Sequence, residues 1–377
     1  MSLCLKCGIY VSYERQSDVS IMKKIIFLFT VLFSQLTFAQ FSGNGFYRVQ
    51  NSTTGRYLTV IDNRASVNMA TTDPDLAAIL PIRNFERIVG NPASVIYIYK
   101  AGDNDYSLRA QNIDSYSLMG VYLHLRAQKD GSYYAYATAS GMTKYLCDEV
   151  SDYDEGWLMT GTVARSWNIV PLQSSSDNYF AALPEMEHDG FYYTTMYAAF
   201  SYKPVNDDVK MYYISLVENN VAVIKEVQDG FVPGNTPVIV KCSSADYSAN
   251  RLDVFATGGS AVSNNCLAGV YFDNSNKKHW NRVAYDPNTM RVLGKLSDGS
   301  LGFVTADIQY LPANKAYLKV PAGSASEIRI ITEDEYLTGI ENVVSNESPE
   351  YYDLSGRRIS KPSKGVYLTS KGKKVFK

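Results

Sequence analysis

Short runs in which apolar and polar residues alternate follow one another along most of the chain. Two pairs of runs show the pattern: Val95–Lys100 with Tyr106–Ala110, and Met211–Val217 with Val221–Val227. A period of two is typical of half-buried β-strands, and two such runs around a turn indicate a hairpin. Helical signals are short: Asp73-Pro74 before Leu76–Leu80, and a capping box at Thr332-x-x-Glu335. The sequence therefore predicts an all-β fold.

Turn dipeptides mark where hairpins are expected. They are Asp130-Gly131, Asp189-Gly190, Asp229-Gly230, Asp298-Gly299 and Asn219-Asn220. Each stands between two β-type runs, and its residues adopt the positive φ of a tight hairpin loop at low cost. We expect a hairpin at each of them.

Residues 41–172 form the first predicted domain. It opens as strand, turn and strand over Gly45–Asn51 and Thr54–Val60. Similar pieces recur at Val121–Ala127 with Tyr133–Thr138, and at Lys144–Cys147 with Trp167–Val170. A domain built only of hairpins favours a barrel or trefoil.

The motifs at the two ends of this domain resemble those of a known family. Tyr47-Arg-Val-Gln-Asn51 with Gly55-Arg-Tyr-Leu58 resembles the start of a ricin-type β-trefoil lectin repeat, and Trp167-Asn-Ile-Val-Pro171 resembles its closing segment. The Gln-x-Trp signature of that family is absent. The resemblance implies a β-trefoil-like domain that binds glycans.

Three residues are candidates for contact with a sugar. Tyr57 and Trp157 would stack on pyranose rings, and Asp62 would accept hydrogen bonds from two hydroxyls. Their alternative roles are structural, as core aromatic residues and a turn aspartate.

A polar stretch, Ser174–Asp177, separates this domain from a second region over residues 178–331. The second region contains an internal repeat: Val232-Pro-Gly-Asn235 precedes one apolar run, and Leu311-Pro-Ala-Asn314 precedes another. We expect each Pro-small-Asn unit to form a tight turn that leads into a core strand. The two halves are expected to be two sheets, or two subdomains, of a β-sandwich. Segments such as Pro312-Ala-Asn-Lys-Ala-Tyr-Leu318 resemble those of secreted Bacteroidetes surface proteins.

Residues 340–377 combine an acidic linker with a basic tail. Tyr352-Asp-Leu-Ser-Gly-Arg-Arg358, Lys364-Gly-Val-Tyr367 and Lys373-Lys-Val-Phe-Lys377 predict a short three-stranded tail. This order of motifs resembles the C-terminal sorting module of Bacteroidetes type IX secretion cargo. The resemblance implies that the secretion machinery reads Gly356, Arg357, Lys364, Gly365 and Tyr367. A solvated, disordered basic end is the alternative.

The start of the chain indicates export. Two lysines after Met22 precede an apolar run over residues 25–33, and small residues at −3 and −1 predict cleavage between Ala39 and Gln40. The run is less than half of the ~20 residues that span a bilayer, and no later run predicts a transmembrane segment in the mature chain. We interpret residues 22–39 as a signal peptide and residues 1–21 as an over-called start.

Composition limits the partners. The chain has 36 basic and 38 acidic residues; four of the basic and two of the acidic ones precede Gln40, so the mature chain carries a formal charge of −4. A near-neutral surface gives no long-range attraction to nucleic acid. Three cysteines remain and allow one disulfide at most, for which Cys242 and Cys266 are the candidate pair. Thirty tyrosines favour half-buried sheet surfaces and offer faces for sugars.

Catalytic and metal-binding motifs are absent from the sequence. The acidic run from Asp148 to Glu155 lacks the glycine that a calcium loop needs, so we expect no metal and no cofactor. The favoured function is a non-enzymatic protein, secreted or held at the outer-membrane surface, that acts in adhesion or glycan binding. Its expected partners are a glycan or a host or bacterial surface, together with the secretion machinery. A purely structural surface or matrix scaffold and an extracellular hydrolase are the alternatives.

Overall fold

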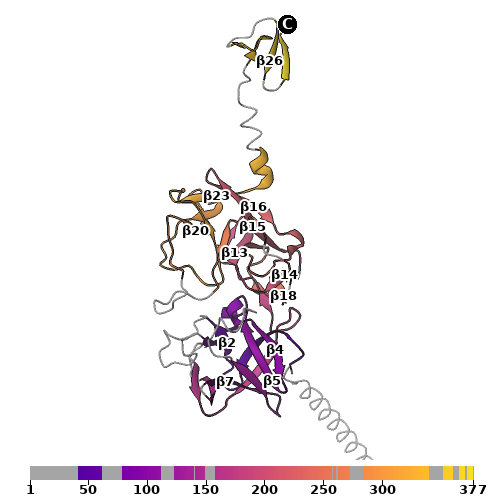
Figure 1. Cartoon of the computed structure of the whole chain (residues 1–377), viewed down its shortest axis with the longest axis vertical. Helices are drawn as coiled ribbons and strands as arrows, with labels where there is room; N and C mark the ends of the chain where they lie inside the picture. The colour runs from indigo at the N-terminus through magenta and orange to yellow at the C-terminus, as the bar shows by residue number, and fades with distance from the viewer. Residues whose placement is uncertain are drawn as a thin grey trace, which may run out of the picture.

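The computed structural model describes residues 41–61, 79–111, 123–139, 141–148, 158–256, 258–259, 262–271, 283–338, 351–359, 365–369 and 372–376. Within these ranges strands dominate, which confirms the predicted all-β class (Figure 1). The described helical segments are short: η2 (Phe85–Arg87), η3 (Pro92–Ser94), η4 (Gln228–Gly230), η5 (Tyr247–Ala249) and a turn of α-helix over residues 333–338. No helix among them is long and apolar enough to cross a bilayer.

The predicted capping box is confirmed at the last of these helices. The backbone N–H of Glu335 donates to Thr332 Oγ1 at 3.2 Å, and the backbone N–H of Thr332 donates to Glu335 Oε2 at 2.7 Å. These bonds satisfy donors that the first helical turn leaves without partners.

The first unit is a ten-stranded sheet that closes into a barrel. Its strands are β1 (Gly45–Asn51), β2 (Tyr57–Val60), β3 (Ile79–Ile82), β4 (Ile96–Gly102), β5 (Asp105–Ala110), β6 (His124–Ala127), β7 (Tyr133–Ala139), β8 (Met142–Asp148), β9 (Leu158–Gly161) and β10 (Ser166–Pro171). β1 pairs with both β4 and β10, and β10 pairs with β7. Pairing therefore runs from β1 through β4, β5, β6, β7 and β10 back to β1, with β2–β3 and β8–β9 as added hairpins.

One expected pairing in this unit is wrong. The run Lys144–Cys147 lies in β8, which pairs with β7 and β9, whereas Trp167–Val170 lies in β10. β10 pairs with β1 instead, because closing the barrel brings the two ends of the unit together.

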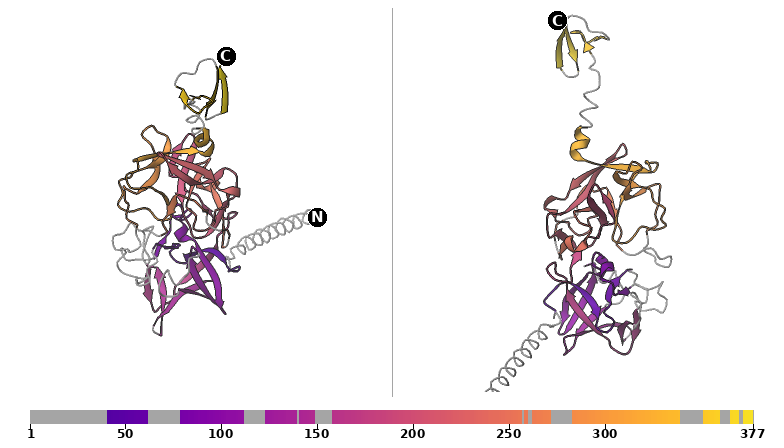
Figure 2. Two further views of the ribbon diagram at one scale, coloured as in Figure 1. Left: turned by 45° about the horizontal axis from the view of Figure 1, so that its top comes forward. Right: turned by 180° about the vertical axis from the view of Figure 1, so that it is seen from behind.

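Strand β1 is buried on both faces, and this joins the barrel to the second region. Tyr47 and Val49 lie in the barrel core. Phe46 lies on the opposite face, in a cluster with residues of the second region, where its ring centroid is 5.3 Å from that of Phe200. Figures 1 and 2 show the two units packed along the long axis of the molecule, and the shared cluster gives their contact an apolar part.

The second region contains two sheets. A three-stranded sheet has the order β11 (Phe180–Ala181), β18 (Arg251–Phe255) and β14 (Ser201–Pro204). A ten-stranded sheet has the order β12 (Met186–His188), β13 (Phe191–Met196), β17 (Val238–Cys242), β15 (Val209–Glu218), β16 (Val221–Glu226), β23 (Glu327–Thr332), β21 (Leu301–Val304), β20 (Met290–Lys295), β22 (Ala316–Lys319) and β19 (Leu267–Gly269). The larger sheet curls like a barrel, since the backbone N–H of Cys266 before β19 donates to Ile214 O in β15 at 2.8 Å.

Most predicted hairpin turns are confirmed. Asp130-Gly131, Asp189-Gly190, Asp298-Gly299 and Asn219-Asn220 join β6–β7, β12–β13, β20–β21 and β15–β16, respectively. The hairpin expected at Asp229-Gly230 is wrong. Both residues have positive φ, 57° and 64°, but they lie in η4 after β16, whose partners are β15 and β23.

The two Pro-small-Asn turns are confirmed and meet on one segment. Asn235 and Asn314 have φ of 66° and 56°, and lead into the buried strands β17 and β22. The backbone N–H of Asn235 donates to Ala198 O at 2.9 Å, and the backbone N–H of Tyr197 donates to Asn314 O at 2.9 Å. The sequence repeat therefore places two equivalent turns beside consecutive residues of the chain.

The described strands near the C-terminus pair among themselves. They are β24 (Tyr351–Tyr352), β25 (Arg358–Ile359), β26 (Gly365–Thr369) and β27 (Gly372–Phe376), and they form a four-stranded sheet where we expected three strands. Gly356 has φ of 83° in the turn before β25, and Arg357 O accepts from the backbone N–H of Asp353 at 2.9 Å. Gly365 and Tyr367 lie in β26, and Lys364, Ala39 and Gln40 lie outside the described residues.

The expected disulfide is not formed. Cys242 and Cys266 are both free thiols in the described structure. The physical reason is that they pack in different cores: Cys242 lies in the cluster of Phe180 and Phe200, and Cys266 packs against the cluster of Phe303.

Candidate functional site

A cleft of about 550 Å³ lies between the barrel and the second region. The barrel side is formed by β2, β3 and the segment from Arg87 to Ala93, which includes the start of η3. The opposite side is formed by Leu183 and Glu185, the end of β13, and the turn from Pro312 to Lys315. Clefts of this size at the junction of two units are where small ligands commonly bind.

A hydrogen-bonded joint connects the two units at Asn314, which lines the cleft. Gln111 of the barrel is fully buried, and its Oε1 accepts from Asn314 Nδ2 and from the backbone N–H of Ala199, both at 3.3 Å. Asn314 Nδ2 also lies 3.2 Å from Tyr197 O. These bonds hold the Pro-Ala-Asn turn against the barrel.

Two buried polar atoms of cleft residues lack a hydrogen-bond partner within the described ranges. They are Thr59 Oγ1, on a residue that is 0% exposed, and Asn314 Oδ1, on a residue that is 5% exposed. A buried polar atom without a partner costs about 1–3 kcal/mol. Native proteins keep few of them, so these two atoms mark positions in the cleft wall where a polar partner is missing.

A charged group lines the same cleft. Lys315 Nζ is 2.9 Å from Glu185 Oε1 and donates to Thr194 Oγ1 at 2.7 Å. The Thr194 hydroxyl is in turn 3.1 Å from Glu185 Oε2. An ammonium group has three N–H donors, so Lys315 keeps one for a ligand. Glu185 is the one carboxylate among the described lining residues.

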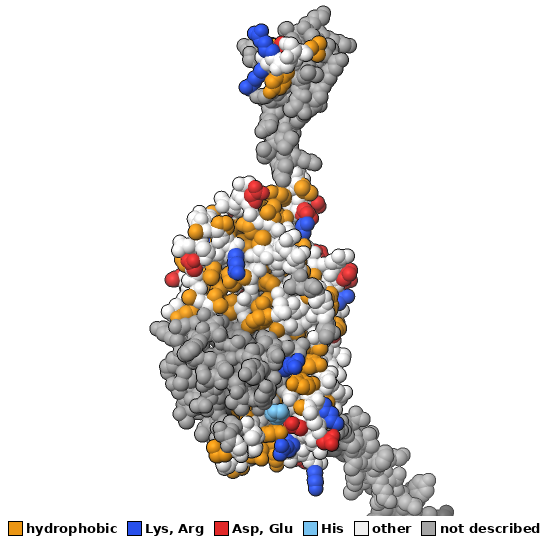
Figure 3. All heavy atoms as spheres, viewed as in Figure 1, with side chains coloured by type: hydrophobic (Ala, Val, Ile, Leu, Met, Phe, Trp, Pro, Cys, Tyr) orange, Lys and Arg blue, Asp and Glu red, His pale blue; other side chains and the backbone are white. Residues whose placement is uncertain are grey.

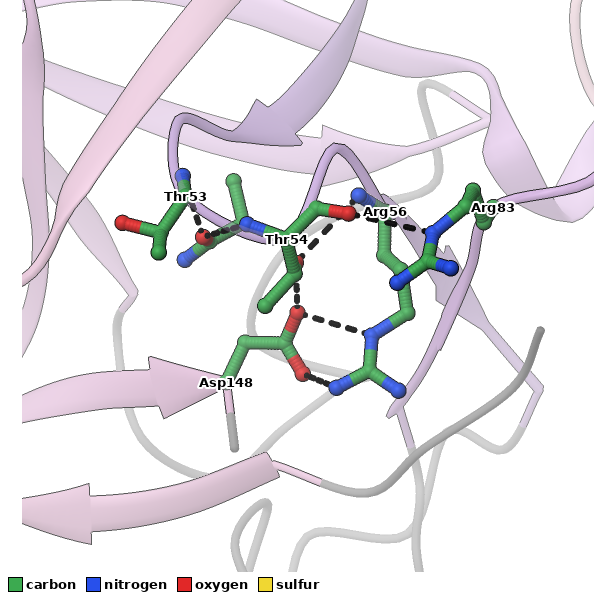
Figure 4. Close-up of polar contacts among 6 residues, drawn as sticks. Thr53, Thr54, Arg56, Arg83 and Asp148 are labelled. Atoms are coloured by element: carbon green, nitrogen blue, oxygen red, sulfur yellow. Dashed lines mark hydrogen bonds and ion pairs between the residues drawn. The ribbon is translucent and has the colours of Figure 1, made fainter. Parts of the chain in front are cut away.

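The acidic cluster noted in the sequence contributes a structural ion pair at its first residue. Asp148 is buried and accepts from Arg56 Nε at 3.0 Å and from Nη2 of the same guanidinium, and also from the hydroxyl of Thr54 (Figure 4). Figure 4 also shows Arg83 donating to Thr54 O, at 3.2 Å. The described residues contain no group of three or more His, Cys, Asp and Glu placed to hold a metal ion. Residues 149–157 lie outside the described part of the chain.

A second polar network lies on the barrel surface. Tyr136 OH donates to Asp105 Oδ1 at 2.7 Å and accepts from Arg126 at 3.0 Å, and His124 Nδ1 is 3.2 Å from Asp105 Oδ2. Burial and the hydrogen bond to Asp105 raise the pKa of Tyr136. None of these side chains lines the cleft.

Of the residues that the sequence suggested for sugar binding, only Tyr57 is described. It lies in β2 on the same face as Thr59, because alternate residues of a strand share a face, but it does not line the cleft. Burial raises the pKa of Tyr57, and the nearby Arg48 guanidinium opposes this shift. Asp62 and Trp157 lie outside the described residues.

Sequence reasoning missed the cleft residues Thr59, Asn314, Lys315 and Glu185. A usable signal existed for two of them. Thr59 is a polar residue in an otherwise apolar strand, and Asn314 ends a repeated turn motif. Lys315 and Glu185 are ordinary surface residues in the sequence, and only the fold brings them together.

Comparison of the chain with protein-family models, with curated proteins and with solved structures finds no match. The assignment of a function therefore depends on the chemistry of the cleft and on the sequence patterns.

Figure 3 shows how side chains are distributed on one face of the molecule. Hydrophobic side chains are widely spread over the described part of the second region, and charged ones are few and scattered among them. Such a surface has no strong field of either sign, which agrees with the near-neutral composition.

Proposed function

We propose that this protein is exported and binds carbohydrate outside the cytoplasm, without catalysis, in the cleft between the barrel and the second region. The observation that carries the proposal is the pair of buried atoms Thr59 Oγ1 and Asn314 Oδ1, which lack partners within the described residues. A sugar hydroxyl both donates and accepts, so it can pair with an amide oxygen and with a threonine hydroxyl. The third N–H of the Lys315 ammonium adds a donor in the same cleft.

We infer further that the barrel is a β-trefoil. The support is its strand pairing, in which a ring through β1, β4, β5, β6, β7 and β10 carries the added hairpins β2–β3 and β8–β9. The resemblance of the opening and closing segments to ricin-type lectin repeats is independent of that pairing. Together they favour an adhesive, glycan-binding role over that of a purely structural scaffold.

The route of export is proposed from the two ends of the chain. The signal peptide predicted before Gln40 and the tail motif at Lys364-Gly-Val-Tyr367 are the expected address signals. Pairing of β24–β27 into one sheet supports a tail that acts as a folded unit. Deletion of residues 351–377 should leave the protein in the periplasm of its host, and unchanged surface display would refute the recognition role.

The test of binding is a glycan array probed with the purified protein, followed by calorimetric titration of the best glycan. Thr59→Val removes the cleft hydroxyl and should weaken binding roughly 2- to 12-fold, the equivalent of one hydrogen bond. Thr236→Val is the matched control, because Thr236 is 1% exposed and its Oγ1 also lacks a partner in the described chain, but it is not in the cleft lining.

Two results would count against the proposal. Absence of binding to every glycan favours the scaffold. Equal weakening by Thr59→Val and Thr236→Val would mean that the effect comes from the fold and not from the cleft.

A further inference from the structure

A second compartment of about 350 Å³ adjoins the polar cleft. The two share four lining residues, namely Glu185, Thr195, Pro312 and Lys315. The two compartments therefore meet at the Lys315–Glu185 ion pair.

The lining of this compartment is almost entirely apolar. It includes Met186, Val292, Leu293, Ile308, Tyr310 and Tyr317. The charged side chains among its described lining residues are Glu185 and Lys315, which lie with Thr195 on the shared boundary, and the other polar groups are the hydroxyls of Tyr310 and Tyr317. The Thr195 hydroxyl accepts from the backbone N–H of Ala316 at 3.1 Å.

Apolar surface in a concave site favours an apolar occupant, because removing both surfaces from water is the main source of binding free energy. Ile308 is 39% exposed, although its aliphatic side chain lines a hollow. The polar cleft next to it presents the opposite chemistry, with Thr59, Asn314 and Lys315 offering hydrogen bonds. The pair of compartments matches a ligand with one polar and one apolar part.

We propose that the ligand is an amphipathic glycoside, whose sugar occupies the polar cleft and whose alkyl or acyl chain occupies the adjoining apolar compartment. This inference rests on the proposed carbohydrate binding and narrows its ligand class to sugars that carry a hydrocarbon chain, such as glycolipid head regions. The ion pair of Lys315 with Glu185 marks the boundary between the two parts.

The experiment is calorimetric titration of the purified protein with methyl, butyl, hexyl and octyl glycosides of β-D-glucose and of β-maltose, each below its micelle concentration. Because each buried methylene contributes about 0.8 kcal/mol, affinity should rise roughly fourfold per methylene until the compartment is full. An affinity that does not change with chain length, for a sugar that the array shows to bind, overturns the inference and leaves the proposed function in place.

A third series, octanoate and octanol, separates the two proposals. Binding of these as tight as that of the octyl glycosides, with no binding of the methyl glycosides, would show an apolar site without a sugar site and overturn both. No binding of any compound in the three series overturns the inference.

Two variants test where the alkyl chain of the ligand binds. Ile308→Ser should reduce the ratio of octyl to methyl affinity by roughly threefold or more and leave methyl glycoside binding unchanged, because Ile308 lines only the apolar compartment. Leu216→Ser in β15 is the matched control, since Leu216 is 37% exposed and lies outside both linings. An unchanged ratio of octyl to methyl glycoside affinity in Ile308→Ser would mean that the alkyl chain binds elsewhere, and would refute the assignment.

Discussion

Asn314 and Gln111 lie 203 residues apart in the chain, yet the Nδ2 of one donates to the Oε1 of the other at 3.3 Å. Gln111 has a positive φ of 52° directly after β5, and Asn314 has one of 56° at the end of the Pro-Ala-Asn turn. Both side chains are buried. The contact connects the barrel to the second region at the cleft, so the shape of the cleft depends on the docking of the two units.

Shortening Gln111 should therefore loosen the docking. Gln111→Asn tolerates the positive φ but is too short to reach both donors, which leaves Ala199 N–H and Asn314 Nδ2 with weaker partners. The expected loss is about 1–3 kcal/mol of unfolding free energy, measured by urea denaturation. Gln128→Asn in the exposed β6–β7 turn is the control and should change stability by less than about 0.5 kcal/mol. If Gln111→Asn and Gln128→Asn were equally stable, the hydrogen bonds of Gln111 to Asn314 and Ala199 would contribute nothing to the unfolding free energy.

The buried ion pair of Arg56 and Asp148 should be costly to break. Both side chains are 0% exposed, so Asp148→Asn leaves a guanidinium buried with a neutral partner. We expect a loss of roughly 3–5 kcal/mol, read from the shift of the denaturation midpoint. Arg329 and Asp298 form an exposed pair, 49% and 47% exposed, and Asp298→Asn should cost much less than Asp148→Asn because solvent screens the exposed charges. If Asp148→Asn and Asp298→Asn lower the unfolding free energy equally, burial does not determine how much an ion pair contributes to stability.

The elements that sequence predicts correctly here are set by neighbouring residues. The turns at Asp189-Gly190 and Asn219-Asn220 have the positive φ that these residue types tolerate, and the two strands that flank each turn pair with each other. Asp229-Gly230 has the same local conformation, but β16 takes the distant strand β23 as its second neighbour, so no hairpin forms there. Local preference sets the turn, and tertiary packing selects the partner.

The candidate site shows the same limit more strongly. Thr59 and Asn314 line one cleft only because the barrel and the second region share an apolar cluster that contains Phe46 and Phe200. Nothing near either residue in the sequence encodes that docking. The pairing of Cys242 with Cys266 failed for a related reason, since proximity within one predicted region does not say which core each thiol enters.

Tyr197 packs closely on Gly269, and this contact tests the cleft through two residues that do not line it. A Cβ built on Gly269 would lie 2.0 Å from Tyr197 Cγ, so Gly269→Ala must push the ring away. The backbone O of Tyr197 accepts from Asn314 Nδ2, and the displacement should therefore also weaken glycan binding. We expect a cost of about 1–3 kcal/mol in stability. Gly102→Ala, whose nearest contact would be at 3.7 Å, is the control, and loss of stability there alone would contradict the packing.

The three cysteines should differ in reactivity. Burial raises the pKa of Cys242 to about 12, and the thiolate is the reactive form, so this residue should resist alkylation at pH 8 in the native protein. Cys147 and Cys266 are half-buried and should be labelled before it. Peptide mass spectrometry after native and denatured labelling measures the order without reduction. Failure of Cys242 and Cys266 to label even in denaturant would show that they form a disulfide after all.

The buried tyrosines predict loss of stability at alkaline pH. Burial raises the pKa of Tyr202 and Tyr271 far above the usual value, so the folded chain keeps protons that the unfolded chain releases above about pH 10. The unfolded state then binds fewer protons, and stability that is present at neutral pH falls as pH rises beyond 10. Urea denaturation at pH 7 to 11, followed with tyrosinate absorbance, measures the decline.

Tyr202→Phe isolates one contribution to that decline. The Tyr202 hydroxyl is buried and lacks a partner in the described part of the chain, so its removal should raise stability at pH 7 by about 1 kcal/mol and flatten the alkaline decline. Tyr136→Phe removes a hydroxyl that bonds Asp105 and Arg126, and should lower stability at pH 7. A destabilised Tyr202→Phe protein would reveal a partner for that hydroxyl and would refute the account of an unpaired group in the core.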